Sequence, residues 1–220
     1  MLASELLSNA MPPARSSDTI QKVIDRMAEF KLSHFPIVND DVFLGLVSED
    51  ELIEQTDYNK PIGDLFLTLV NPYVVESQHI YDVMRLFYEQ DLSIVPVLDI
   101  RKNYLGAISI NSMNEYFAKL TSVAEPGGII VLEITNRNNS LAHMAQIVES
   151  DNAQVLSSYL RSFPDSTRLE ITLKVNKQDI SGIVAAFLRY NYTVQATFNF
   201  TPVDDDSMNR YDSLMNYLNL

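Results

Sequence analysis

The chain has 220 residues, of which 46% are hydrophobic and 20% charged, and its formal net charge is −13. A chain of this length and composition can bury one large core or two ordinary ones. It contains no cysteine, which excludes thiol nucleophiles, disulfides and thiolate metal ligands. Neither half carries the basic stripe that binding to a phosphate backbone requires, so no nucleic acid partner is expected.

No apolar run approaches the roughly 20 residues that span a bilayer, so we expect no membrane association. Residues 1–17 lack the basic start and continuous apolar stretch of a signal peptide. A cytoplasmic protein is therefore expected.

Two copies of one pattern, each about sixty residues long, fill residues 1–120. Apolar residues at i, i+3, i+4 and i+7 in 20–27 return in 80–87 and predict an amphipathic helix in each copy. Apolar segments follow at 35–38 and 94–98, and each predicts a strand that is buried on both faces. Each copy then closes with Leu-Gly, two apolar residues and a serine, which is Ser48 in the first copy and Ser109 in the second.

We therefore predict a short helix, a strand, a longer helix, two strands and a closing helix in each repeat, over 1–59 and 60–120. A repeated unit that cannot bury its own apolar face packs against its twin, and clefts form between the two. These clefts are where we expect a binding site.

Residues 121–127 contain Glu-Pro-Gly and predict a linker. A second pattern follows in 128–200, with expected strands at 129–135, 153–160, 168–175 and 192–198 and expected helices at 140–150 and 180–190. The order βαββαβ is that of a split βαβ sandwich with both helices on one face. Asn176 is expected to cap the second of these helices.

Residues 201–220 predict an acidic turn around Asp204–Asp206 and then an amphipathic helix. Its apolar residues, Tyr211, Leu214, Met215 and Leu218, would have to dock on the same domain or on a partner.

The sequence offers no pattern for catalysis or for a metal. The three histidines share no metal-ligand spacing with each other or with carboxylates, and the three aspartates lack the spacing and glycine of a calcium loop. There is no P-loop, no Ser–His–Asp arrangement and no pair of carboxylates in an apolar setting. We expect neither an enzyme nor a metal site.

The tandem units resemble a pair of CBS domains. The segment 45–51 is similar to that family's signature, which has a glycine, two apolar residues, Ser or Thr, and an acidic residue three positions further on. Residues 128–198 resemble an ACT domain, and the combination is similar to the acetoin-utilisation type of CBS–ACT protein. The resemblance implies an α/β CBS pair of tandem β-α-β-β-α repeats, followed by a ferredoxin-like α+β domain. It also implies a homodimer, since both module types generally dimerise.

The resemblance further implies that AMP, ADP or ATP binds between the repeats. By position, the Ser48 hydroxyl would meet phosphate, and the Glu51 carboxylate would accept hydrogen bonds from ribose hydroxyls. Arg15 and His34 are candidates to offset the phosphate charge. Ser48 and Glu51 could equally form a helix cap with a solvated first-turn acid.

The second repeat matches the signature only in part. Ser109 stands at the phosphate position, but Ser112 stands where the acid is expected. Because a serine cannot bind both ribose hydroxyls as a carboxylate does, we expect the second site to be weakened or lost.

Two functions remain open. The first is a non-catalytic sensor, in which a bound adenine nucleotide shifts the arrangement of the repeats and the change is transmitted to the rest of the chain. The second is a scaffold with degenerate ligand sites, which would hold an unidentified protein partner through its acidic surface and terminal helix.

Overall fold

The computed structural model describes residues 1–7, 11–65, 71–134, 140–164 and 167–198. The chain divides into two compact units, Met1–Tyr116 and Phe117–Leu220, each described here by itself. The predicted acidic turn and helix in 201–220 lie outside the described residues.

The first repeat has the predicted order of elements except for the strand before its longer helix, where only a single bridge forms at Ala14. They are η1 (Ala3–Leu6), α1 (Ile20–Phe30), β1 (His34–Asn39), β2 (Val42–Ser48) and α2 (Glu49–Ile53). Helix α1 begins after Thr19, whose side chain accepts a hydrogen bond from the Lys22 N–H, and it ends at Lys31 in a left-handed conformation. Three residues of the expected apolar stripe, Ile20, Val23 and Met27, are buried, and Ile24 is half-buried.

The second repeat has the full predicted order, including the strand before the longer helix. Its elements are η2 (Ile62–Asp64), β3 (Val74–Val75), α3 (Ile80–Gln90), β4 (Ile94–Leu98), β5 (Tyr104–Ser109) and α4 (Ile110–Leu120). Strand β3 pairs in parallel with β4, whereas its counterpart in the first repeat is a single parallel bridge from Ala14 to Ile37. The pair that the first repeat lacks is the equivalent of Val75 with Leu98, which would be Arg15 with Val38, and the Arg15 N–H donates instead to the Asp18 carboxylate over 2.9 Å.

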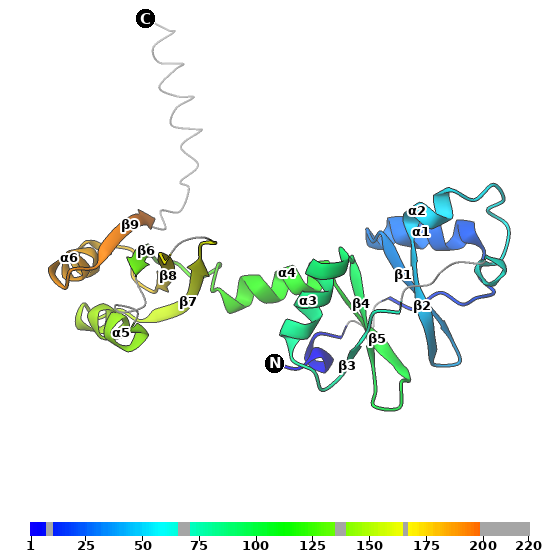
Figure 1. Ribbon diagram of the computed structural model, residues 1–220, viewed down its shortest axis with the longest axis horizontal. Coiled ribbons are helices and arrows are strands. Elements are labelled where there is room, and N and C mark those ends of the chain that lie inside the picture. The colour runs from blue at the N-terminus through cyan, green and yellow to red at the C-terminus, as the bar shows by residue number, and fades with distance from the viewer. Residues whose placement is uncertain (8–10, 66–70, 135–139, 165–166, 199–220) are drawn as a thin grey trace, which may run out of the picture. The chain divides into compact units, whose positions relative to one another are not determined.

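The two hairpins, β1–β2 and β4–β5, are antiparallel and lie side by side in the first unit (Figure 1). Each contains a register shift, which falls between Ile37 and Val38 in the first and between Val97 and Leu98 in the second. The signature glycines, Gly45 and Gly106, have φ angles of 149° and 151° at this point. Such angles are accessible to glycine and strained for other residues, which explains why both copies need glycine here.

The leading segments of the two repeats are exchanged. The Ala3 N–H donates to the Gln78 carbonyl at the start of α3, over 2.9 Å. In the same way the Ile62 N–H donates to the Asp18 carbonyl just before α1, over 2.9 Å. Each repeat therefore completes the other, and the pair folds as one unit.

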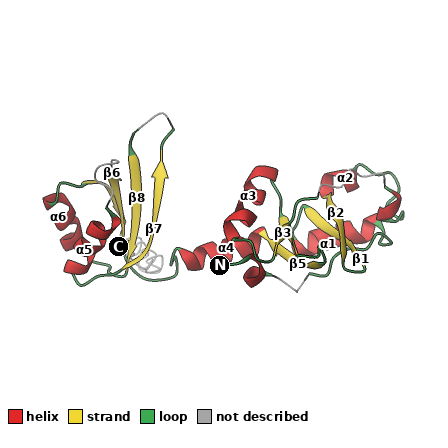
Figure 2. Ribbon diagram, turned by 60° about the horizontal axis from the view of Figure 1, so that its bottom comes forward, coloured by secondary structure: helices red, strands yellow, loops and turns green. Residues whose placement is uncertain are grey.

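The second unit has the predicted βαββαβ order. Its elements are β6 (Ile129–Ile134), α5 (Leu141–Ser150), β7 (Val155–Ser162), β8 (Leu169–Val175), α6 (Ser181–Arg189) and β9 (Thr193–Phe198). The four strands form an antiparallel sheet in the order β7-β8-β6-β9, and both helices cover one of its faces (Figure 2). The predicted fold class, a CBS-type pair followed by a ferredoxin-like domain, is confirmed.

The predicted cap of α6 is wrong. Helix α6 begins at Ser181, and the Asn176 side chain accepts a hydrogen bond from the Gln154 N–H, over 2.8 Å, at the start of β7. Asp179 serves the start of the helix instead, since its carboxylate accepts from the Ser181 N–H and hydroxyl at 3.1 and 2.6 Å. The Asn176 amide is bound to a distant segment, which local spacing does not reveal.

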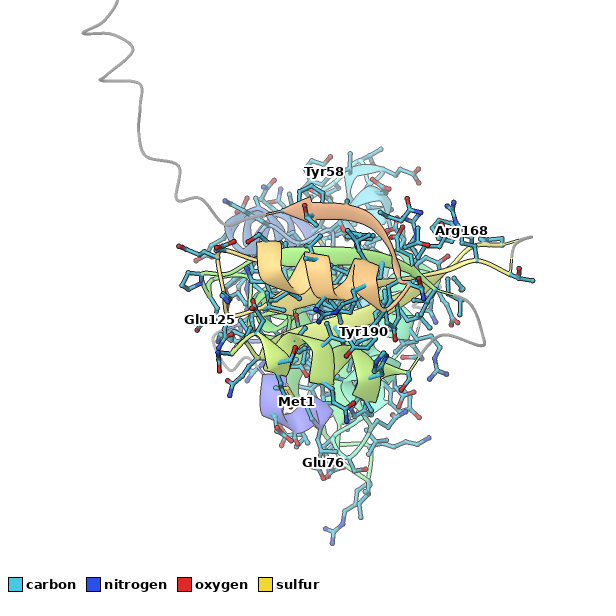
Figure 3. The ribbon with its side chains drawn as sticks, turned by 90° about the vertical axis from the view of Figure 1, so that its left-hand side faces the viewer. Met1, Tyr58, Glu76, Glu125, Arg168 and Tyr190 are labelled. Carbon is cyan, nitrogen blue, oxygen red and sulfur yellow. The ribbon has the colours of Figure 1, made fainter. Side chains whose placement is uncertain are left out.

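Tyr190, which follows α6, lies on the helical side of the second unit (Figure 3). The rings of Tyr190 and His143 on α5 are nearly perpendicular with centroids 5.0 Å apart, and Nδ1 of His143 lies 2.8 Å from the Tyr192 hydroxyl. Within the part of the chain that the structure describes, no helix has the length and apolar character needed to cross a membrane.

Candidate functional site

Ser48 and Glu51, the two residues predicted to hold a nucleotide, bind each other. The Ser48 N–H and hydroxyl both donate to Oε2 of Glu51 over 3.0 Å, and the Glu51 N–H donates to Ser48 Oγ over 3.3 Å. This is a capping box at the start of α2, in which each side chain satisfies a free N–H of the first turn. A ligand at this position would have to displace these hydrogen bonds.

The surroundings of His34 are acidic. Burial lowers the pKa of this half-buried imidazole below its ordinary value, while the carboxylates of Asp91, Glu51 and Asp50 act in the opposite direction. The same three carboxylates would repel a phosphate placed beside His34. Arg15 is exposed, and its backbone N–H donates to Asp18 over 2.9 Å in the turn before α1.

His34 also lies where the two repeats are joined. The N–H groups of Ser33 and His34 both donate to Ser93 Oγ, over 3.1 and 2.8 Å. The Ser93 N–H in turn donates to Nδ1 of His34 over 3.4 Å. The strand starts of β1 and β4 are thus linked by one serine hydroxyl and one imidazole.

In the second repeat, Ser109 caps the start of α4. The Ser112 N–H donates to Ser109 Oγ over 3.1 Å, and the two hydroxyl oxygens are 3.0 Å apart. Ser112 thus takes the place that Glu51 has in the first repeat, and the site carries no carboxylate at this position.

A pocket of about 190 Å³ opens beside Ser109. Its lining comes from both repeats and consists of Met11, Phe30, Leu32, Ile94, Ala107, Ser109 and Asn111. The pocket therefore lies on the side of the duplication where the sequence predicted the weaker site.

The repeat alignment shows how the lining of this pocket differs from the matching positions of the first repeat. Ala107 is matched in the first repeat by Leu46, a fully buried side chain, so the smaller alanine leaves space beside Ser109. Asn111 is matched by Asp50, which replaces a neutral amide with a carboxylate. The alanine two residues before Ser109 is the signal in the sequence that could have located the pocket.

A second pocket, of about 290 Å³, lies elsewhere in the first unit. Its lining is Ser16, Ile37, Asn39, Leu44, Ile62, Gly63 and Leu65. Its two polar side chains bind each other, since Nδ2 of Asn39 donates to Ser16 Oγ over 2.7 Å. It contains none of the predicted site residues.

A comparison with family models supports the CBS part of the predicted resemblance. The CBS domain family model matches residues 3–57, which is the first repeat. An uncharacterized protein of Methanocaldococcus jannaschii is 27% identical over 106 residues. That match covers 48% of this chain and 40% of the relative, so the chain matches less than half of the relative's length.

Solved structures of CBS proteins are similar to about half of the chain. A CBS domain pair/ACT domain protein from Thermotoga maritima is 21% identical, with a TM-score of 0.48 over 53% of this chain and 96% of that one. CBSX2, solved in complex with AMP, is 19% identical, with a TM-score of 0.46 over 53% of this chain and 95% of that one.

Proposed function

We propose that this chain is a non-catalytic regulatory protein that binds an adenine nucleotide between the repeats of its first unit and transmits binding by a conformational change. The observation that carries the proposal is the pocket beside Ser109, because both repeats line it. A ligand in contact with both repeats stabilises one arrangement of the pair over others. The CBS match in the first repeat supports this reading.

The pocket adjoins the hydrogen bonds that join the repeats. Leu32 and Ile94 line it, and their sequence neighbours Ser33 and Ser93 belong to the link that connects β1 with β4. Ligand binding and the strength of this link are therefore coupled in our proposal.

Helix α4 offers a route from the pocket to the second unit. It begins directly after Ser109 and carries Asn111 in its first turn, and it also contains the boundary between the two units, at Tyr116 and Phe117. A shift of the first turn of α4 on ligand binding would move a helix that continues into the ACT-like unit.

The proposal includes no catalytic step. The pocket lining offers one hydroxyl and one amide, and none of its side chains titrates near neutral pH. We further propose a homodimer and a cytoplasmic protein of the acetoin-utilisation type, which rest on the resemblance to CBS and ACT modules. Light scattering of the purified chain, whose mass is 24.9 kDa, should report twice that mass.

A thermal-shift screen tests the nucleotide proposal. AMP, ADP, ATP and S-adenosylmethionine are added at millimolar concentration, with and without magnesium. A ligand that binds only the folded state stabilises it by about 2.7 kcal/mol at one hundred times its Kd, which raises the melting temperature. The sensor proposal fails if none of the four changes the melting temperature.

Two variants locate the ligand. Ala107→Leu copies Leu46 of the first repeat and should remove the shift by filling the pocket, whereas Ser48→Ala should leave it in place. The opposite pattern would place the nucleotide at Ser48 and Glu51, the position implied by the family signature.

The scaffold function is the second candidate. It is favoured by the mutual hydrogen bonds of Ser48 and Glu51 and by the carboxylates around His34, which leave the first repeat poorly suited to an anionic ligand. A flat response to all four compounds would support it.

A further inference from the structure

We infer that the pocket beside Ser109 recognises the adenine base and leaves the phosphates in solvent, so that adenosine and its phosphates bind with similar affinity. The inference rests on the proposed function and specifies which part of the ligand the protein contacts.

The pocket offers no cation to a phosphate. Its described lining has four large apolar side chains, an alanine, a serine and an asparagine. Arg26 contacts the segment that follows Met11, where its guanidinium donates to the carbonyls of Pro12 and Pro13 and lies over the Phe35 ring. The net charge of −13 adds a general repulsion of polyanions.

The start of α4 is also partly closed to phosphate. Free N–H groups in the first turn of a helix are what normally bind this anion. Here the Ile110 N–H donates to the Ser93 carbonyl over 3.0 Å, and the Ser112 N–H donates to Ser109 Oγ over 3.1 Å. Two of the donors that would face a phosphate are therefore already used.

The size of the pocket suits one ring system. Its volume, about 190 Å³, is below the range of roughly 300–1,000 Å³ that is typical of pockets enclosing a whole small-molecule ligand. A base can enter, while ribose and phosphates remain outside. Ser112 agrees with this arrangement, because it offers no carboxylate to hold the ribose hydroxyls.

The lining suits adenine in particular. Phe30 supplies an aromatic ring for stacking, and Leu32 and Ile94 supply apolar surface. Asn111 is exposed at the pocket and carries both a donor and an acceptor, which together match N7 and the amino group of adenine. Asn111 is therefore the residue that would select the base.

Isothermal titration of the full chain tests the inference with adenosine, AMP, ATP and inosine at low and high salt. We expect similar Kd values for adenosine, AMP and ATP, little dependence on salt, and weaker binding of inosine, which has an acceptor where adenine donates. Asn111→Asp should weaken adenosine binding by roughly 5- to 150-fold, because it removes the donor to N7. The matched control, Asp50→Asn in the first repeat, should leave adenosine binding unchanged.

The possible results separate the inference from the proposed function. ATP binding that is at least about tenfold tighter than adenosine binding, and that weakens with salt, would overturn the inference and leave the nucleotide sensor standing. Failure of all four compounds to bind would overturn both. If Asn111→Asp does not fold, the comparison of adenosine with inosine on the unaltered chain still decides whether the base is read, and equal Kd values for the two would overturn the inference.

Discussion

The backbone N–H of His34 in the first repeat donates a hydrogen bond to Ser93 Oγ in the second repeat, over 2.8 Å. The same oxygen accepts from the Ser33 N–H over 3.1 Å, so one hydroxyl holds the starts of two strands that are separated by sixty residues of sequence. Ser33 is the equivalent of Ser93 in the first repeat, but its hydroxyl has a different partner. It contacts Nδ1 of the neighbouring His34 ring at 3.2 Å.

Ser93→Ala should destabilise the first unit. It leaves two backbone N–H groups without their acceptor, and we expect the free energy of unfolding to fall by about 1–3 kcal/mol. The matched control is Ser33→Ala at the equivalent position, which removes one exposed contact and should change the free energy by less than about 1 kcal/mol. Urea unfolding measures the free energy of unfolding of both variants. Equal losses would show that the hydrogen bonds accepted by the Ser93 hydroxyl do not stabilise the pair of repeats.

Stability should fall as the pH is lowered through the range of histidine titration. Burial holds the pKa of His34 below its ordinary value of 6.5, so the folded chain binds fewer protons here than the unfolded chain as the pH falls through that value. The contribution of neutral His34 is therefore complete above the unfolded pKa and is lost on acidification. Urea unfolding at several values between about pH 7.5 and 5.5 should show the decline.

The variant His34→Ile isolates this effect, because it copies Ile94 of the second repeat. Its stability should change less with pH over the same range than that of the unaltered chain. A pH dependence as steep as the original would assign the decline to other groups.

The capping box at Ser48 should contribute to stability and not to ligand binding. Ser48→Ala removes the side-chain acceptor for the Glu51 N–H and should cost about 0.5–2 kcal/mol. Glu51→Gln retains an acceptor for the Ser48 N–H and should cost less. Thermal unfolding of both variants, with and without AMP, measures the loss of stability and the rise in melting temperature on binding. If AMP no longer raised the melting temperature of Ser48→Ala, the ligand would be placed in the first repeat.

Gly127→Ala should severely destabilise the second unit. A Cβ at this position would lie 1.9 Å from the Val175 carbonyl oxygen, so the backbone itself would have to move, at a cost of at least about 1–3 kcal/mol. Gly182→Ala is the milder comparison, because the atoms it meets belong to the Asp151 carboxylate, which can rotate away. Circular dichroism during heating should rank the two, and an unchanged melting temperature for Gly127→Ala would contradict the predicted clash.

Most of the fold could be predicted from the sequence. The apolar spacing of α1 and α3, the buried strands β1 and β4 and the glycines at 45 and 106 are local patterns that appear twice. The cap of α6 was predicted wrongly because the Asn176 amide binds Gln154, twenty-two positions away, and not its own helix. Exchange of the leading segments between the repeats was not predicted, because it depends on which chain ends meet in space.

The sequence by itself determined which residues occupy equivalent positions in the two repeats, and it singled out Ser48 and Ser109 as the starts of matching helices. Only the tertiary structure decided what each serine does. Ser48 is bound to Glu51, beside a fully buried Leu46, whereas Ser109 borders a pocket beside the smaller Ala107. The physical reason is that a cavity depends on side-chain volumes contributed by separate segments, and a motif records only its own residues.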